Sequence, residues 1–430
     1  MQFKGAEKAS IVNGVGCQLL RLPLWFWLVM VMGAVIRLYL VVFTEGTRDV
    51  SIWQGHANRV REIGLIRYYH ENPLANHPPF ISVTESFVLR AANVTRIPFR
   101  ILLRMPFALI DAGTVMLLLS VLRHNPRRLV LAAAYWLHPL AMLLSSYHGN
   151  TDDAVAFFIL LCVWLLSKKN TMGGAIALGA SLWIKLPGVL AIPALLLLVE
   201  GWRKKLVFLS VAGLTAIATY LPALLQDPRI VYANVFGYHG KILKTTAGVP
   251  VWGIRVLLSA YMPHEWPKEH AARTVFLLNH SWQIAIVLLL LLTWLRRTRC
   301  SPSEVCATIA AGYTLVYGLT DYWAFQYFAW SVPFWFFLPT WFLVFTTILA
   351  GGYIYSLYWF LCGNPWLLGK WDFVGHPHWP DIVIEFRDLA MLFFAVSACW
   401  FVISAAAEQI KPWLLRITSR ATGPQKPGGL

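Results

Sequence analysis

Charged residues are scarce in this sequence, and acidic residues are scarcer than basic ones. Only 13% of the 430 residues are charged, whereas a water-soluble chain carries about 25%, which counts against a soluble globular enzyme. There are 36 Lys and Arg against 20 Asp and Glu, which gives a net charge of +16. These basic residues punctuate long apolar runs instead of forming one basic domain. The pattern therefore favours a polytopic membrane protein with basic cytoplasmic loops over a nucleic-acid-binding protein.

Cysteines are also few, and they show no framework spacing. The six are Cys17, Cys162, Cys300, Cys306, Cys362 and Cys399. Their positions in or beside apolar runs exclude a disulfide scaffold. Cys300 and Cys306 lack the paired short spacings and histidine partners of a zinc site. No internal repeat relates one half of the chain to the other, which counts against, without excluding, a transporter built from repeats.

Long apolar runs dominate the sequence. A spanning helix needs about 20 mostly apolar residues, and the mean hydropathy is +0.59. The runs cover residues 22–43, 101–122, 129–147, 154–167, 172–184, 187–199, 206–225, 282–295, 305–319, 327–338, 341–361 and 389–410. We therefore expect an all-α polytopic membrane protein with about 12 transmembrane helices. Several runs are short, and 172–199 also fits one bent helix, so the count varies by one or two.

The distribution of Lys and Arg predicts the orientation. Basic residues gather at alternate junctions and in the carboxyl-terminal tail, the pattern of cytoplasmic loops, so we expect both termini in the cytoplasm. The long loops, residues 44–100, 226–281 and 363–387, then lie outside and are expected to hold helices. This gives four regions: a cytoplasmic segment (1–21), a main transmembrane module (22–338), further transmembrane helices (339–410) and a basic cytoplasmic tail (411–430). A bacterial or archaeal plasma membrane is expected, with the ER membrane as the alternative.

Three charged residues fall inside predicted spans. Arg37 lies in the first span, and Arg104 and Asp111 lie in the second. Charges within the bilayer are costly and are usually paired or face a cavity. We expect structural ion pairs, with Asp111 meeting Arg37.

Polar groups that suit chemistry gather at the outer ends of the spans. Asp49 follows the first span, and His56 lies further along the same loop. A turn between two spans carries His148, Asn150 and Asp152. A capped helical hairpin explains Asp152 equally well, so a structural interpretation of that turn stays open.

Basic and aromatic residues follow on the same predicted side. Basic candidates for holding a phosphate are Lys185, His239, Lys241 and Arg255. Gln326 and Trp330 lie in a polar and aromatic run that suits either interfacial anchoring or a sugar. Each of these segments, taken alone, is as typical of solvated surface charges as of a binding site. Together, on one side of the membrane, they predict chemistry on a lipid-linked substrate.

Four motifs in this order resemble the GT-C superfamily of integral-membrane glycosyltransferases. Asp49 with Trp53 resembles the first-loop acid motif, and residues 76–79 (Asn-His-Pro-Pro) resemble the Tyr-Pro-Pro element of that loop. Residues 147–152 (Tyr-His-Gly-Asn-Thr-Asp) and 326–330 (Gln-Tyr-Phe-Ala-Trp) are similar to runs of the mannosyltransferase that adds the first mannose to GPI anchors. One departure is that this chain has Asp49-Val50-Ser51 where the GPI enzymes have Asp-x-Asp. This difference counts against dependence on a divalent metal and leaves the donor sugar open between mannose and others.

The resemblance implies an inverting hexosyltransferase in glycan biosynthesis. It would move a sugar, mannose being one candidate, from a polyprenyl phosphate to a lipid-linked or glycan acceptor outside the cytoplasm, with no cofactor and no nucleic acid. Asp49 would be the general base, and cations would hold the leaving phosphate. The residues expected to bind the donor phosphate are Lys185, His239, Lys241 and Arg255. The residues expected to bind the sugar or the acceptor are His56, His148, Asn150, Asp152, Gln326 and Trp330.

Two other functions fit part of the sequence. A transporter or flippase of a lipid-linked sugar fits the number of spans, but it would need intramembrane charges forming a relay across the bilayer. A non-enzymatic assembly factor gives no reason for acids and cations to share one face.

Overall fold

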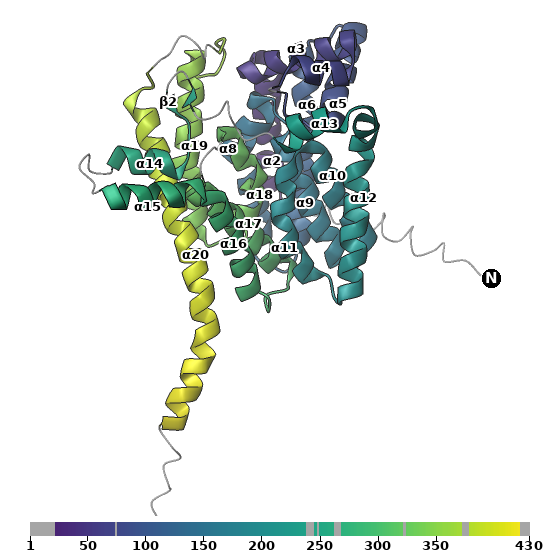
Figure 1. Cartoon of the computed structure of the whole chain (residues 1–430). Helices are drawn as coiled ribbons and strands as arrows, with labels where there is room; N and C mark the ends of the chain where they lie inside the picture. The colour runs from purple at the N-terminus through teal and green to yellow at the C-terminus, as the bar shows by residue number, and fades with distance from the viewer. Residues whose placement is uncertain are drawn as a thin grey trace, which may run out of the picture.

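The computed structural model describes residues 22–73, 75–237, 245–246, 249–261, 268–320, 324–371 and 378–421. Within them the chain is almost entirely helical, and the two strands, β1 (Thr245–Thr246) and β2 (Val249–Pro250), pair antiparallel over two residues each. The helices pack side by side as a bundle, from which the long last helix, α20, projects at one end (Figure 1). An all-α membrane fold, as predicted from the apolar runs, follows from these elements.

The helices before the strands divide into membrane-type helices and a cluster at one end of the bundle. The membrane-type helices and their irregular extensions are α2 (Leu24–Phe43), α6 (Phe99–Val121), α7 (Arg128–Trp136), α8 (Pro139–Met142), η1 (Leu143–His148), α9 (Asp152–Ser167), α10 (Thr171–Ile184), η2 (Leu186–Ala191), α11 (Ile192–Leu195), η3 (Leu196–Leu198) and α12 (Trp202–Gln226). The cluster contains α3 (Arg48–Ile63), α4 (Leu65–Glu71), α5 (Pro79–Thr95), α13 (Pro228–Val231) and η4 (Tyr232–Phe236), seen together in Figure 1. The loop expected at 44–100 is therefore helical.

The helices after the strands complete the second half of the bundle. They are α14 (Ile254–Tyr261), α15 (Lys268–Asn279), α16 (Ser281–Leu295), α17 (Pro302–Leu319), η5 (Phe325–Trp330), α18 (Val332–Trp335), α19 (Thr340–Cys362) and α20 (Asp381–Ala421). The backbones of α17 and α20 approach closely, since a Cβ on Gly318 would lie 2.5 Å from the carbonyl oxygen of Phe394. Glycine is therefore required at that crossing.

The expected count of about 12 transmembrane helices is not confirmed. Five of the described helices are long and apolar enough to span a membrane, or up to seven if each of two bent pairs is one span. Each of the predicted runs does form helix, but several are short. For example, α9 has 16 residues and α10 has 14, and the run at 187–199 is broken into 3-10 and α segments. Apolar composition alone did not reveal these breaks.

The intramembrane ion pair predicted between the first two spans is confirmed. The Arg37 guanidinium donates to Asp111 Oδ2 through Nε at 3.0 Å and Nη2 at 2.8 Å, and both side chains are buried. Tyr135 and Ser145 donate their hydroxyls to the same carboxylate at 2.7 Å each. The pair thus joins α2, α6, α7 and η1, and its hydrogen bonds offset the cost of burying charge.

Arg104 makes no ion pair with a described residue, so the expectation of an ion pair was wrong for it. Its guanidinium donates instead to backbone carbonyls where two helical segments end. At the end of α2 the acceptors are Val41 at 2.9 Å and Thr44 at 2.6 Å, and at the end of η1 the acceptor is Tyr147 at 3.3 Å. The last carbonyls of a helix have no partner within it, and Arg104 supplies donors to both sets.

Replacing Arg104 by lysine should weaken this junction although the charge is kept. An ammonium has three donors on one atom and cannot reach carbonyls of two segments as a planar guanidinium does. We expect Arg104→Lys to lower the free energy of unfolding in detergent by about 3 kcal/mol, because buried carbonyls lose their donor. Arg123→Lys is the matched control, since Arg123 is exposed in the turn after α6. Equal stability of the two variants would contradict the role given to Arg104.

Candidate active site

Asp49 stands in the first turn of α3, directly after the first membrane helix. Between the two helices the chain turns at Gly46, whose φ is +79°, and a Cβ there would lie 2.9 Å from the carbonyl oxygen of Tyr147. Thr47 precedes α3 and donates its hydroxyl to the carbonyl oxygen of His148 at 2.9 Å. A tight turn and one hydrogen bond therefore fix the start of α3 against the end of η1, with Asp49 facing that end.

His148 ends η1 and contacts Asp49 through its ring. Its Nε2 lies 3.1 Å from Asp49 Oδ2, and its Nδ1 lies 2.6 Å from the hydroxyl oxygen of Tyr358 on α19. Asn150 donates Nδ2 to the same Asp49 oxygen at 3.2 Å. The His148 side chain is fully buried, whereas 30% of the Asp49 side chain is exposed. The carboxylate is thus held by two inner side chains and open on its outer side.

The turn after His148 depends on Gly149. Its φ is +75°, and a Cβ there would lie 2.8 Å from Val50 Cγ2 and 3.1 Å from Arg104 Cδ. Only glycine combines this left-handed backbone with so little space. The turn brings Asn150 back toward Asp49 and then starts α9 at Asp152.

Lys185 and Asp152 form a buried ion pair beside this cluster. The ammonium Nζ lies 2.8 Å and 2.9 Å from the two carboxylate oxygens, and 14% of Lys185 and 2% of Asp152 are exposed. Trp330 donates its indole N–H to Asp152 Oδ1 at 2.5 Å. Lys185 also lies 4.9 Å from the centre of the Tyr327 ring. The predicted phosphate-binding lysine is therefore already oriented by a carboxylate and an aromatic face.

Two further histidines lie near Asp49, His56 on α3 and His77 in the connection between α4 and α5. The His77 ring is tilted by 43° against Trp53 with 4.1 Å between ring centres, and the ring centres of His56 and His77 are 6.3 Å apart. Burial lowers the pKa of His77 well below its usual range, and the charges of Lys185 and His56 lower it further. Burial also lowers the pKa of His56, against the opposing charge of Asp49. Both pKa values therefore lie below that of a free imidazole.

The pKa of Asp49 is lowered although the group is partly buried. Burial by itself raises it, but the hydrogen bond and charge of His148 and the charges of Lys185 and His77 outweigh burial. The carboxylate is therefore ionised at neutral pH and acts as a hydrogen-bond acceptor only.

The structure gives fewer contacts for the remaining predicted site residues. Arg255, on α14, donates to the side chain of Asn279 at 3.2 Å. Gln326, on η5, has a buried Oε1 with no hydrogen-bond partner among the described residues. His239 and Lys241 lie outside the described residues. The assignment of these four residues to substrate binding stays a prediction.

Tyr358 and His77 are the site residues that sequence reasoning did not assign. Tyr358 belongs to α19, beyond the run in which motifs were found, and nothing local marks it among its apolar neighbours. His77 sits in the Asn-His-Pro-Pro element, for which the sequence indicated a resemblance but no role for the histidine. Within the described ranges no group of three His, Cys, Asp or Glu side chains is placed to hold a metal ion.

Comparison with known families gives one match. The profile of Glycosyltransferase family 87 matches residues 88–320, more than half of the chain. No curated protein sequence matches the chain. The matched segment includes His148, Asn150, Asp152 and Lys185, while Asp49 lies before it and Tyr358 after it.

The lowered pKa of Asp49 predicts how stability depends on pH. A carboxylate whose folded pKa lies below its usual value of 3.8 stabilises the fold above that value. This contribution is lost as pH falls through the folded pKa. We expect the stability difference between the wild type and Asp49→Asn, measured by thermal unfolding in detergent, to be constant from pH 5 to 8 and to shrink below about pH 4. A difference that grows on acidification would contradict the pairing with His148.

Proposed function

Because the chain belongs to glycosyltransferase family 87, a family of GT-C-type membrane glycosyltransferases, we propose that it moves a sugar from a polyprenyl phosphate to a lipid-linked or glycan acceptor. The transfer takes place on the non-cytoplasmic face with inversion at the anomeric carbon, and mannose is the first donor sugar to test. One observation supports this above all: the Asp49 carboxylate is ionised, held by His148 and Asn150, and exposed on one side at the outer end of the first membrane helix.

Asp49 acts as the general base of a single displacement. The acceptor hydroxyl oxygen attacks the anomeric carbon, the bond from that carbon to the phosphate oxygen breaks, and the hydroxyl proton passes to Asp49. The two ring nitrogens of His148 lie within hydrogen-bond distance of Asp49 Oδ2 and of the Tyr358 hydroxyl, so the ring is held at both nitrogens. His148 and Asn150 thus orient Asp49 Oδ2 and leave Oδ1 for the acceptor.

Lys185 stabilises the phosphate that leaves. Two of the contacts of its ammonium go to Asp152, and an ammonium has three donors, so one is available to a phosphate oxygen. His239, Lys241 and Arg255 are proposed as further phosphate ligands. Trp330 holds Asp152, while the buried Gln326 Oε1 suits a sugar hydroxyl. His56 is proposed to contact sugar or acceptor.

The side of the membrane follows from the charges at the two ends of the helices. Lys168 and Lys169 end α9, and Arg203 to Lys205 begin α12. Asp152 and Lys185 lie at the opposite ends of α9 and α10, and Asp49 contacts the same cluster through His148. The Lys and Arg asymmetry therefore supports a site on the non-cytoplasmic face. A bacterial or archaeal plasma membrane is the proposed location, with the ER membrane as the alternative.

Purified protein incubated with a panel of polyprenyl-phosphate sugars should yield a glycosylated lipid or glycan, detected by mass spectrometry of lipid extracts. Asp49→Asn should lower kcat by about 10²–10⁴-fold, the usual contribution of a general base, with donor binding retained. Glu45→Gln is the matched control, since Glu45 is an exposed carboxylate four residues away. Full transfer by Asp49→Asn would overturn the assignment. Movement of a lipid-linked sugar across liposomes without a covalent product would favour a flippase.

Removing Lys185 should weaken transfer more than donor binding. Lys185→Met alone would leave Asp152 buried without its cation, so the informative variant is Lys185→Met with Asp152→Asn, in which both charges are removed. We expect kcat/KM to fall by roughly 10²-fold, as when one donor to a developing charge is lost. Asp152→Asn alone keeps the ammonium and should retain most activity. Equal activity of the double variant and the exposed control Lys169→Met would exclude Lys185 from phosphate stabilisation.

A further inference from the structure

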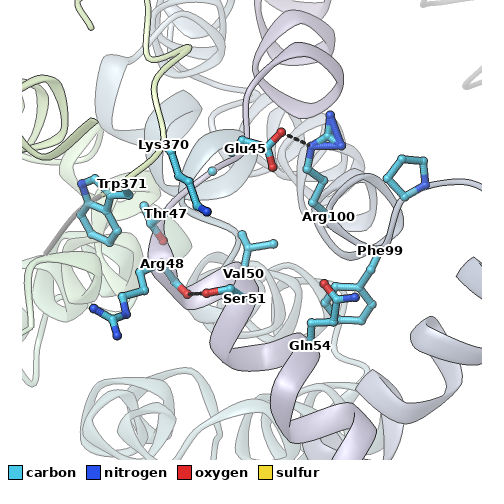
Figure 2. A pocket seen from close by; sticks show the side chains of 12 residues that line it. Glu45, Thr47, Arg48, Val50, Ser51, Gln54, Phe99, Arg100, Lys370 and Trp371 are labelled. Carbon is cyan, nitrogen blue, oxygen red and sulfur yellow. Dashed lines mark hydrogen bonds and ion pairs between the residues drawn. The ribbon is translucent and has the colours of Figure 1, made fainter. Parts of the chain in front are cut away.

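The other side of α3 carries a second group of cations around a cavity. Asp49, Trp53 and His56 point to the side of α3 described above, whereas Arg48, Ser51 and Gln54 line a cavity of about 500 Å³. The spacing of three residues puts the second set on one helical face. Figure 2 shows the cavity, with Arg48 and Trp371 on one side and Phe99 and Arg100 on the other.

The lining of this cavity is basic. It includes three cations, Arg48, Arg100 and Lys370, and one acid, Glu45, so its net charge is 3 − 1, or +2. Glu45 lies 3.5 Å from Arg100. The side chains of Arg48 and Lys370 have no hydrogen bond or ion pair with any described residue, and Figure 2 shows Lys370 extending toward Val50. Two cations that have no partner in the described part of the chain, beside one cavity, suit an anion with several oxygens.

The cavity lies at membrane-surface level. Glu45 follows the end of α2, and Arg100 is the second residue of α6. Arg100 donates to the carbonyl oxygens of Thr44 at 3.2 Å and Val42 at 3.5 Å, which fixes it over the end of α2. Both helices are long and apolar enough to cross a membrane. Cations at such a position attract lipid phosphates.

An apolar groove lies along the same two helices, closer to their middle than the cavity is. Its volume is about 470 Å³, and its lining includes Val41, Leu38 and Ala34 of α2 and Met105 and Leu109 of α6. Val41 lies four residues before Glu45, and Met105 lies five after Arg100, so the outer end of the groove is about one helical turn from the cavity. The seam between α2 and α6 is thus cationic at the membrane surface and apolar below it.

We propose that this seam binds a membrane lipid with a phosphate in its head group, the phosphate lying among Arg48, Arg100 and Lys370 and one hydrocarbon chain lying in the groove. The charge and the depth of the two parts match those of such a lipid. The inference does not rest on the proposed function, because it concerns binding and not transfer. It also gives these three cations a role separate from that of Lys185, which is paired with Asp152.

The full chain, purified in detergent and titrated with phosphatidic acid, tests the proposal by native mass spectrometry. Diacylglycerol with the same chains lacks the phosphate, and glycerol 3-phosphate lacks the chains. Phosphatidic acid should bind at least about tenfold more tightly than either, since cations near a membrane contribute about fivefold each. Equal binding of diacylglycerol would overturn the cationic site. Equal competition by glycerol 3-phosphate would overturn the lipid.

Two variant pairs locate the site. Arg48→Gln with Lys370→Gln should weaken binding of phosphatidic acid by roughly thirtyfold, while Arg61→Gln with Arg90→Gln, which removes the same charge from exposed positions on α3 and α5, should not. Ala34→Phe should fill the groove and weaken binding, whereas Val35→Phe, on the neighbouring exposed position outside the groove lining, should not. All four residues of the charge variants are exposed, so folding is kept. Unchanged binding by Arg48→Gln with Lys370→Gln, or equal losses in that variant and its control, would refute the proposal.

Discussion

The hydrogen bonds of Arg104 to the ends of two helical segments are the contact on which the candidate site depends. Asp49 follows the end of α2 by six residues, and His148 is the last residue of η1. The same guanidinium bonds carbonyls at both ends, and Gly46 and Gly149 pack directly against its side chain. Neither helical segment by itself fixes the residue at which it ends. Joined through one buried cation, they place Asp49 and His148 within hydrogen-bond distance.

Burying that cation without an acid is unusual, and the carbonyl dipoles explain it. The carboxyl end of a helix carries partial negative charge on its unpaired carbonyls. Two such ends converge on Arg104, so the guanidinium replaces its hydration with several oriented dipoles. The Arg37–Asp111 pair likewise joins helical segments deeper in the bundle, where α2, α6, α7 and η1 meet. Together the two arginines set the register of α2 against α6.

Some of this arrangement could be predicted from the sequence. Lys and Arg asymmetry and the positions of polar residues indicated that Asp49, His148 and Asn150 share one side, and the cost of buried charge indicated the Arg37–Asp111 pair. The number of spans could not be derived, because composition does not show where a helix breaks, as it does around Pro187. Tyr358 could not be found either, since a tyrosine among apolar residues of α19 has no local signature. The pairing of Lys185 with Asp152 depends on how α9 and α10 pack, which a linear pattern does not specify.

The electrostatics of Asp49 constrain how such a site can accelerate transfer. Cations and an imidazole keep the carboxylate ionised and lower its pKa, so it is a weaker base than a carboxylate in an apolar pocket. A strong base is not what sugar transfer needs most, because the transition state resembles an oxocarbenium ion in which the bond to the leaving group is largely broken. The proton of the acceptor hydroxyl becomes acidic only as the hydroxyl oxygen bonds to the anomeric carbon, which happens late in the displacement. In the proposed mechanism, stabilising the departing phosphate therefore matters more than basicity, and a cation already oriented by Asp152 and Tyr327 would need little reorganisation to do so.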